Sequence, residues 1–158
     1  MKKLVLLIIV FLASCQPQPS AGEKSQTPNA KSQTTLTKTY IDPAQGYSQA
    51  VAVEANGIKT IYISGQVGEG ENFEAQFRDA LSKLLQTLEN SGATFKDVTK
   101  YNTYVVNYQP AHLDTFRTIR KELLGDKYMP ASTLVGVQSL GLPKWGVEIE
   151  ATALVKVD

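Results

Sequence analysis

The chain has almost no side chains that serve as soft nucleophiles or as transition-metal ligands. Its 158 residues contain one cysteine, Cys15, and one histidine, His112. A single cysteine excludes a disulfide within the chain, and a single histidine excludes a multi-histidine metal site built from one copy. We therefore expect neither a metal nor a cofactor. The remaining chemistry must come from carboxylates, hydroxyls, amides, lysines and three arginines, Arg78, Arg117 and Arg120.

The chain also lacks a charge imbalance. Sixteen lysines and arginines face fifteen aspartates and glutamates, so the formal net charge is +1. Without a basic bias, no overall field attracts nucleic acid, and we expect no nucleic-acid partner. Apolar residues make up 42% and charged residues 20% of the chain, which is ordinary for one soluble globular domain.

Long apolar runs are missing except near the start. Leu4–Leu12 is unbroken and apolar, but it is shorter than the ~20 residues that a membrane-spanning helix needs. Two lysines precede it and Leu12-Ala13-Ser14-Cys15 follows, which is the layout of a secretory signal and resembles a bacterial lipobox. We expect residues 1–14 to be a lipoprotein signal peptide and Cys15 to be lipidated. The alternatives are an ordinary cleaved signal with an incidental cysteine, or an uncleaved anchor.

Lipidation at Cys15 predicts an exported protein that is anchored to a bacterial membrane, on its periplasmic or cell-surface face. The following segment, Gln16 to about Lys38, is rich in Ser, Thr, Gln, Pro and Lys and nearly free of large apolar residues. Such a composition cannot bury enough surface to offset its ordering entropy. We expect residues 15–38 to be a flexible tether with a reach of roughly 25–30 Å, and residues 39–158 to form the folded domain.

Two segments of the domain have helical periodicity. From Phe73 to Leu88 the apolar residues share one face, and Gly92 follows where a left-handed cap residue is favoured. A second helix is expected from Pro110, which suits a first helical turn, to Gly125.

Alternating patterns around these helices predict strands. Asn56-Gly57 marks a hairpin between Gln49–Glu54 and Lys59–Ser64, and further strands are expected at Val98–Val106, Thr133–Val137 and Val147–Lys156. In the last strand Val147 and Ile149 share one face, while Glu148 and Glu150 share the other. The predicted order is β-β-β-α-β-α-β-β, an α+β fold with both helices on one face of the sheet.

Four short motifs within this order resemble one family, the Rid proteins, also called the RidA/YjgF or L-PSP endoribonuclease-like group. They match in sequence, order and approximate spacing, and the resemblance covers most of Tyr40 to Val157. It implies a chorismate-mutase-like α+β fold and a homotrimer with a small-molecule pocket at each subunit interface. The motifs are Tyr47-Ser48-Gln49-Ala50, Ser64-Gly65-Gln66, Pro130-Ala131-Ser132-Thr133 and Glu148-Ile149-Glu150-Ala151-Thr152-Ala153.

The resemblance also implies a reaction, the hydrolysis of imines and enamines derived from amino acids with release of ammonia. In the matching motifs the water-positioning glutamate corresponds to Glu148 and a pocket tyrosine to Tyr47, the two candidate catalytic residues. Ser64 and Gly65 correspond to a pocket hydroxyl and a close backbone approach. For each of these the alternative is structural: a solvated Glu148, a Tyr47 that packs with its hydroxyl in water, and a turn at Ser64-Gly65.

One motif departs from the family pattern. Where the enzymatically understood Rid proteins have Pro-Ala-Arg-Ser, this chain has Ser132 at the arginine position. Arginine suits this position because its planar fork binds both oxygens of a substrate carboxylate. Arg117 is one substitute, since by an ungapped count it matches a helix position that approaches the pocket in well-studied Rid proteins. The alternative is that Arg117 pairs with Asp114 or Glu122 on the surface.

Two functions remain open from the sequence. The first is a hydrolase of imine-like metabolites that uses Glu148 and a water molecule, with an altered substrate because Ser132 replaces the arginine. The second is a ligand-binding or scaffolding lipoprotein that keeps the pocket without turnover. A ribonuclease activity, which the historical family label implies, is disfavoured because the chain lacks a basic surface bias.

Overall fold

The computed structural model describes residues 35–157. The predicted signal peptide, Cys15 and nearly all of the predicted tether lie outside the described residues. Within the described residues, neither helix is long and apolar enough to cross a membrane. In the same part of the chain, no three His, Cys, Asp or Glu side chains gather where they would hold a metal ion.

The described domain has the predicted order of elements, so the α+β expectation is confirmed. The first strand, which the sequence patterns did not delimit, begins at Thr37. The second helix is followed by an edge strand, β5, that starts two residues before the expected Thr133 and so includes Ala131 and Ser132. The elements are β1 (Thr37–Ala44), β2 (Tyr47–Ala55), β3 (Ile58–Val67), α1 (Phe73–Asn90), β4 (Val98–Val106), α2 (Pro110–Leu124), β5 (Ala131–Val137) and β6 (Val147–Lys156).

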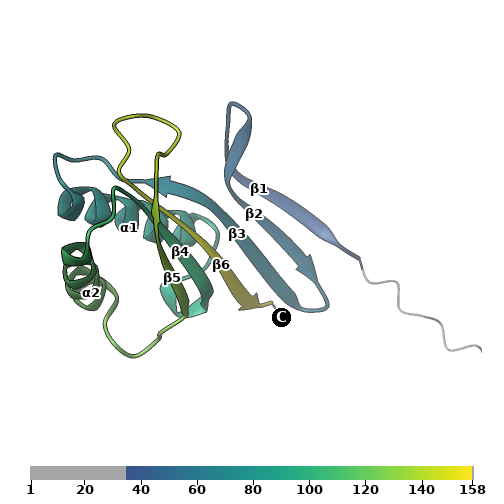
Figure 1. Cartoon of the computed structure of the whole chain (residues 1–158). Coiled ribbons are helices and arrows are strands. Elements are labelled where there is room, and N and C mark those ends of the chain that lie inside the picture. Colours follow the sequence, from purple (N-terminus) through teal and green to yellow (C-terminus); the bar gives the residue numbers. More distant parts are fainter. Residues whose placement is uncertain (1–34, 158) are drawn as a thin grey trace, which may run out of the picture. The chain divides into compact units, whose positions relative to one another are not determined.

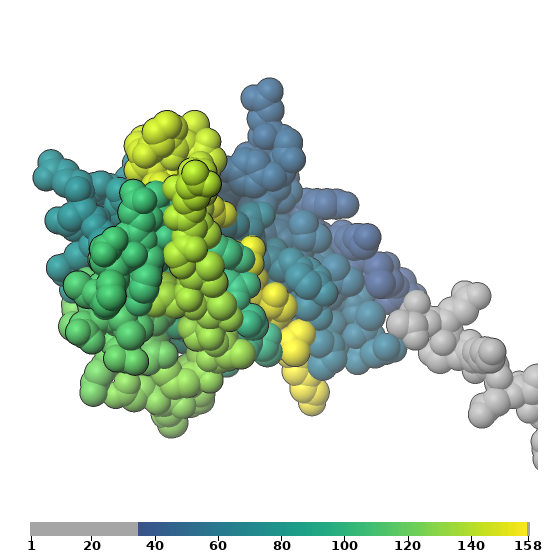
Figure 2. Space-filling model, in the orientation of Figure 1, coloured from purple at the N-terminus to yellow at the C-terminus, as the bar shows by residue number. Residues whose placement is uncertain are grey.

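The strands form one mixed sheet in the order β1-β2-β3-β6-β4-β5. Only the β4–β5 pair is parallel; every other neighbouring pair is antiparallel. The last strand, β6, therefore lies between β3 and β4, and β1 and β5 form the two edges (Figure 1). Figure 2 shows β5, in yellow-green, along the surface of the domain.

Both helices begin and end where local chemistry favours it. The Asn72 side chain accepts a hydrogen bond from the Ala75 N–H at 2.9 Å and so caps the start of α1. Gly92, with a φ of 70°, follows the end of α1. Pro110 occupies the first turn of α2, and Gly125, with a φ of 72°, ends it.

The helices lie on one face of the sheet, which we call the covered face (Figure 1). The apolar side of α1 packs on alternate residues of β3 and β6, and Phe77 of α1 lies 5.1 Å from Phe116 of α2 between ring centroids. On β6, Val147 and Ile149 are fully buried, as the alternation predicted. The other side of the sheet, the open face, therefore carries Glu148 and Glu150.

The third strand contains an irregularity at the Ser-Gly motif. Ile63 pairs with Ala151, but Gln66 pairs with Ile149, so Ser64 and Gly65 together stand opposite one residue of β6. This is a β-bulge, which breaks the regular ladder and redirects side chains. It places the Ser-Gly motif beside Glu148 and Glu150.

Candidate functional site

The candidate site is built around Glu148 on the open face of the sheet. Glu148 lies near the start of β6, opposite Val67 of β3 on one side and Tyr104 of β4 on the other. Its side chain is half-buried. No hydrogen bond or ion pair engages its carboxylate within residues 35–157, so both oxygens remain available to a water molecule or a ligand.

Gly65 provides the space that the Glu148 carboxylate occupies. A Cβ atom at position 65 would collide with Oε1 of Glu148 and would lie 2.5 Å from its Cδ. The requirement is one of space, since only a residue without a side chain allows the carboxylate to lie against the backbone of the bulge. The predicted close approach at Gly65 is therefore an approach to Glu148 itself.

The neighbouring carboxylate, Glu150, is held in place by β4. Its Oε1 accepts hydrogen bonds from Asn102 Nδ2 and from the Tyr104 hydroxyl, both at 2.8 Å. Two short hydrogen bonds to one oxygen fix the position of this carboxylate. The site thus contains one fixed carboxylate and one free carboxylate.

This arrangement changes how the site titrates. Burial, and secondarily the negative charge of Glu150, raise the pKa of Glu148 above its usual range. The hydrogen bond to Glu150, together with burial, raises the pKa of the Tyr104 hydroxyl, which therefore stays protonated as a donor. A carboxylate with a raised pKa is a stronger base, which is what the deprotonation of a water molecule requires.

Hydrogen bonds from the amide side chains of Gln66 and Gln49 hold the bulge in place. Gln66, only 6% exposed, donates from Nε2 to Gln49 Oε1 at 2.9 Å and to the Ser64 carbonyl at 3.0 Å. Its Oε1 accepts a hydrogen bond from the Thr87 hydroxyl of α1 at 3.3 Å. Gln66 therefore fixes the bulge to both the second strand and the first helix.

The same network reaches Tyr47, the second predicted catalytic residue. Gln49 Nε2 donates to the Tyr47 hydroxyl at 3.3 Å, while the Tyr47 side chain remains 54% exposed at the start of β2. Ser64 donates its hydroxyl proton to the Ser48 carbonyl at 2.6 Å, so only its oxygen lone pairs remain free. The structure brings Tyr47, Ser64, Gly65 and Glu148 to neighbouring strands at one end of the sheet.

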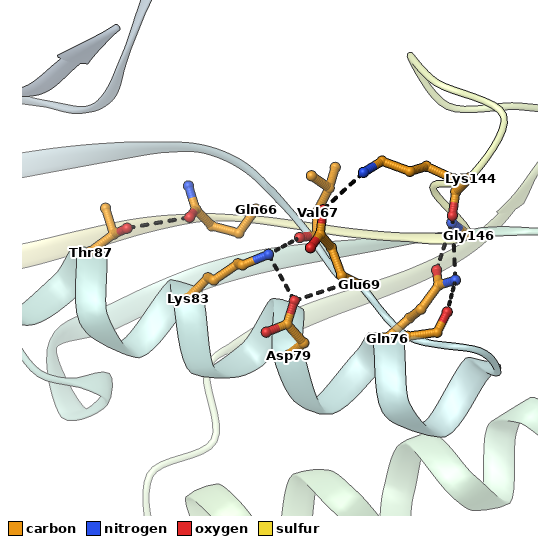
Figure 3. Close-up of polar contacts among 10 residues, drawn as sticks. Gln66, Val67, Glu69, Gln76, Asp79, Lys83, Thr87, Lys144 and Gly146 are labelled. Atoms are coloured by element: carbon orange, nitrogen blue, oxygen red, sulfur yellow. Dashed lines mark hydrogen bonds and ion pairs between the residues drawn. The ribbon is translucent and has the colours of Figure 1, made fainter.

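Contacts from α1 hold the ends of the strands that carry the site (Figure 3). Lys83 donates to the carbonyl of Val67, the last residue of β3, at 3.0 Å and pairs with Asp79 at 2.7 Å. Gln76 Oε1 accepts from the N–H of Gly146, the residue before β6, at 2.7 Å. These contacts fix the backbone on both sides of the Gly65–Glu148 approach.

Ser132 is not part of this group within one chain. It lies on edge strand β5 at the register position of Tyr101, and Tyr101 is opposite Ala151 and buried. Residues in register share a face of a sheet, so Ser132 belongs to the covered face and Glu148 to the open face. A pocket that contains both residues requires a second copy of the chain.

Arg117 is likewise separated from Glu148, because α2 lies on the covered face. Its guanidinium pairs with Asp114 within the helix at 3.8 Å, and its side chain is 64% exposed. The pairing is one of the two alternatives that the sequence left open. A role for Arg117 in a pocket stays a prediction, and it also requires a second copy.

Three contributors to the site were not predicted as functional: Asn102, Tyr104 and Glu150. The sequence contained only a weak signal, because Asn102 and Tyr104 alternate with Tyr101, Thr103 and Val105 in one strand. Their role depends on strand order, because these two side chains reach Glu150 only when β6 pairs with β4.

Comparison with known sequences places the domain in a family. The family described as endoribonuclease L-PSP matches residues 37–155, almost the whole described domain. A 2-iminobutanoate/2-iminopropanoate deaminase of Dermatophagoides farinae is 32% identical over 123 residues, which cover 72% of this chain and 89% of that protein.

Solved structures agree with this placement. A member of the YjgF/YER057c/UK114 family from Mycobacterium tuberculosis superposes with a TM-score of 0.63 at 30% identity, covering 75% of this chain and all of that one. A Rid family protein of unknown function from Yersinia pestis gives a TM-score of 0.58 at 34% identity, covering 75% of this chain and 98% of the other. The chain therefore belongs to the endoribonuclease L-PSP family, the group also called YjgF or Rid.

Proposed function

We propose that the protein binds a small imine- or enamine-type metabolite beside Glu148 and hydrolyses it. The observation that carries the proposal is the free, half-buried Glu148 carboxylate, whose pKa is raised next to the fixed carboxylate of Glu150. The deaminase of Dermatophagoides farinae, 32% identical, supports the reaction class.

In the proposed reaction Glu148 accepts a proton from a bound water molecule as the water oxygen attacks the carbon of the C=N bond. The electron pair of that bond moves to nitrogen, which takes up a proton. The resulting amino alcohol collapses to a carbonyl group and releases ammonia. In this proposal the Ser64 oxygen, on the adjacent strand β3, and Tyr47, on β2 beyond it, orient the substrate.

A second function is binding without turnover. Ser132 favours it, because position 132 has no cation to hold a substrate carboxylate, and Arg117 is already paired with Asp114. A pocket with Glu148 and no carboxylate clamp would prefer ligands that lack the carboxylate of the usual imines. Such a protein would serve as a ligand-binding or scaffolding lipoprotein.

We further propose that the active form is a homotrimer. The open face of the sheet is not covered by any described element, yet it carries Tyr62, 54% exposed, and Leu154, 45% exposed. Exposed apolar side chains gathered on one face mark an interaction surface. A second copy is also needed to bring Ser132 or Arg117 to Glu148, as the separation of the two faces requires.

We also propose that the protein is exported and anchored to a bacterial membrane through a lipid on Cys15. The support is the sequence alone: two lysines, an apolar run and Leu-Ala-Ser before the cysteine. A Cys15→Ser variant is expected to leave the membrane fraction or to remain unprocessed. If the variant stays membrane-bound and is processed normally, the anchor is not at Cys15.

The test of the reaction couples an amino-acid oxidase, which generates imines, to the purified protein and follows the imine lifetime. We expect the wild-type protein to shorten that lifetime and Glu148→Gln to abolish the effect. Ser132→Arg is expected to increase the rate for imines that carry a carboxylate. An inactive wild type with an active Ser132→Arg variant would favour a family pocket that has lost this reaction.

A further inference from the structure

A second cleft lies away from Glu148, where the segment after α2 leads into β5. Its volume is about 460 Å³, which is within the range of small-molecule sites. Figure 2 shows this segment, in light green, at the surface of the domain. The cleft is lined by Lys96, Val98, Thr99, Lys127, Tyr128, Met129, Pro130 and Ala131.

Two ammonium groups define the chemistry of the cleft. Lys96 Nζ lies 5.5 Å and Lys127 Nζ lies 5.3 Å from the centroid of the Tyr128 ring. Each makes a cation–π contact, which is a weak interaction at an exposed site. Within residues 35–157, neither ammonium group has a carboxylate partner, whereas Lys83, Lys121 and Lys144 are ion-paired.

The carboxylates next to these lysines in the sequence are engaged elsewhere. Asp97 accepts hydrogen bonds from the N–H and the hydroxyl of Thr94, at 2.8 and 2.9 Å. Asp126 pairs with Lys121 at 3.1 Å. No acidic residue lines the cleft. The two positive charges therefore face a hollow that contains nothing of opposite charge.

The rest of the lining is apolar or aromatic. The Tyr128 ring is 41% exposed, Met129 is exposed beside it, and Val98 and Pro130 complete the wall. The lining therefore fits a ligand with two parts: an anionic group that binds the lysines, and an apolar part that packs against Tyr128 and Met129.

From these contacts we infer that the cleft is a binding site for an organic anion, a carboxylate or phosphate attached to an apolar group, held by Lys96 and Lys127. Within one chain the site is separate from the Glu148 carboxylate, because it lies at the other end of β4, at Val98 and Thr99. The inference is independent of the reaction proposed above, and the two can fail separately.

Phenyl phosphate is the probe, titrated into the purified protein at low ionic strength by isothermal titration calorimetry. Inorganic phosphate supplies the charge without the ring, and phenol supplies the ring without the charge. We expect phenyl phosphate to bind most tightly, inorganic phosphate more weakly and phenol not detectably. Raising the salt concentration is expected to weaken binding, because exposed charges are screened.

The variant that tests the assignment is Lys96→Gln combined with Lys127→Gln, which is expected to weaken phenyl phosphate binding by about tenfold or more. Lys144→Gln is the matched control, because it removes an exposed lysine far from the cleft and should leave the affinity unchanged. Both lysines are exposed, and a circular dichroism melt confirms that the variants fold.

Two results overturn the inference. One is a double variant that binds phenyl phosphate as tightly as the wild type. The other is a wild type that binds none of the three probes. If that protein associates with vesicles of anionic phospholipid through the same lysines, the cleft is a membrane contact instead.

Discussion

At the scale of single residues, the main feature is the contact between Gly65 and Glu148. One residue without a side chain allows a carboxylate to lie against the backbone, and two hydrogen bonds fix the second carboxylate beside it. The result is a pair of acids with different tasks, a common way for one fold to keep a base and its electrostatic partner apart.

Gly65→Ala is expected to lower the free energy of unfolding by about 1–3 kcal/mol, because the added methyl group collides with the Glu148 side chain. The measurement is urea denaturation, repeated in a Glu148→Ala background that removes the colliding atoms. In that background the cost should largely disappear. Equal costs in both backgrounds would show that the two residues do not touch.

Glu148 also predicts a pH dependence of stability. Its folded pKa is raised by burial and by Glu150, so the ionised carboxylate disfavours the folded state. The neutral form dominates in both states below the unfolded pKa, and the penalty develops as the pH rises through the folded pKa. Glu148→Gln should therefore raise the melting temperature at pH 7 by a few degrees at most, and the gain should vanish near pH 3.5.

The control for this measurement is Glu89→Gln, at an exposed position of α1. It should not change the melting temperature at either pH. A Glu148→Gln protein that is less stable than the wild type at pH 7 would contradict the raised pKa.

At the scale of elements, periodicity predicted both helices and the burial of alternate residues in β6, because those patterns depend only on which side faces the core. It did not predict the bulge in β3. The strand was expected to end at Ser64, whereas it continues to Val67 through an irregular pairing. A bulge depends on the register with β6, a strand about eighty residues later, and no local pattern contains that information.

The site was predictable to the same extent. The motifs named Tyr47, Ser64, Gly65 and Glu148, and the structure brings them to one end of the sheet. The roles of Asn102 and Tyr104 were missed, because hydrogen bonds to Glu150 depend on strand order rather than on spacing within one strand.

A substitution at Gln66 tests whether its hydrogen bonds hold the bulge in β3. Gln66→Met keeps the length of the side chain but removes its hydrogen bonds, leaving Gln49 and Thr87 without their partner. We expect the free energy of unfolding to fall by about 1–3 kcal/mol. Amide hydrogen exchange should become faster near Ser64, where the bulge is held. Gln86→Met, at an exposed position of α1, should have little effect on either measurement.

At the scale of the whole molecule, the sheet has one face covered by helices and one face open. The residues of the proposed pocket are divided between the two faces, which a single chain cannot join. The open face and its exposed Tyr62 and Leu154 thus become the natural place for contact between copies.

Leu154→Lys should shift the protein from a species of three chain masses toward the monomer in analytical ultracentrifugation. A charged side chain on a buried interface is costly to desolvate. Leu142→Lys changes an equally exposed leucine in the loop before β6 and should leave the assembly intact. A wild type that sediments as a monomer would refute the trimer.

The bulge in β3 also has a consequence for how the strand tolerates sequence change. Before it, the residues that face the helices are odd-numbered, Ile61 and Ile63; after it, the inward residue is the even-numbered Gln66. In the two halves of this strand, therefore, residues of opposite parity face the helices: odd-numbered ones before the bulge and even-numbered ones after it. If Ser64 and Gly65 paired one-to-one with β6, without the bulge, Gln66 would turn outward and Val67 inward. Deleting either residue would keep Gln66 inward but would remove the bulge that carries Ser64 and Gly65 beside Glu148. The length of this motif is thus constrained as tightly as its composition.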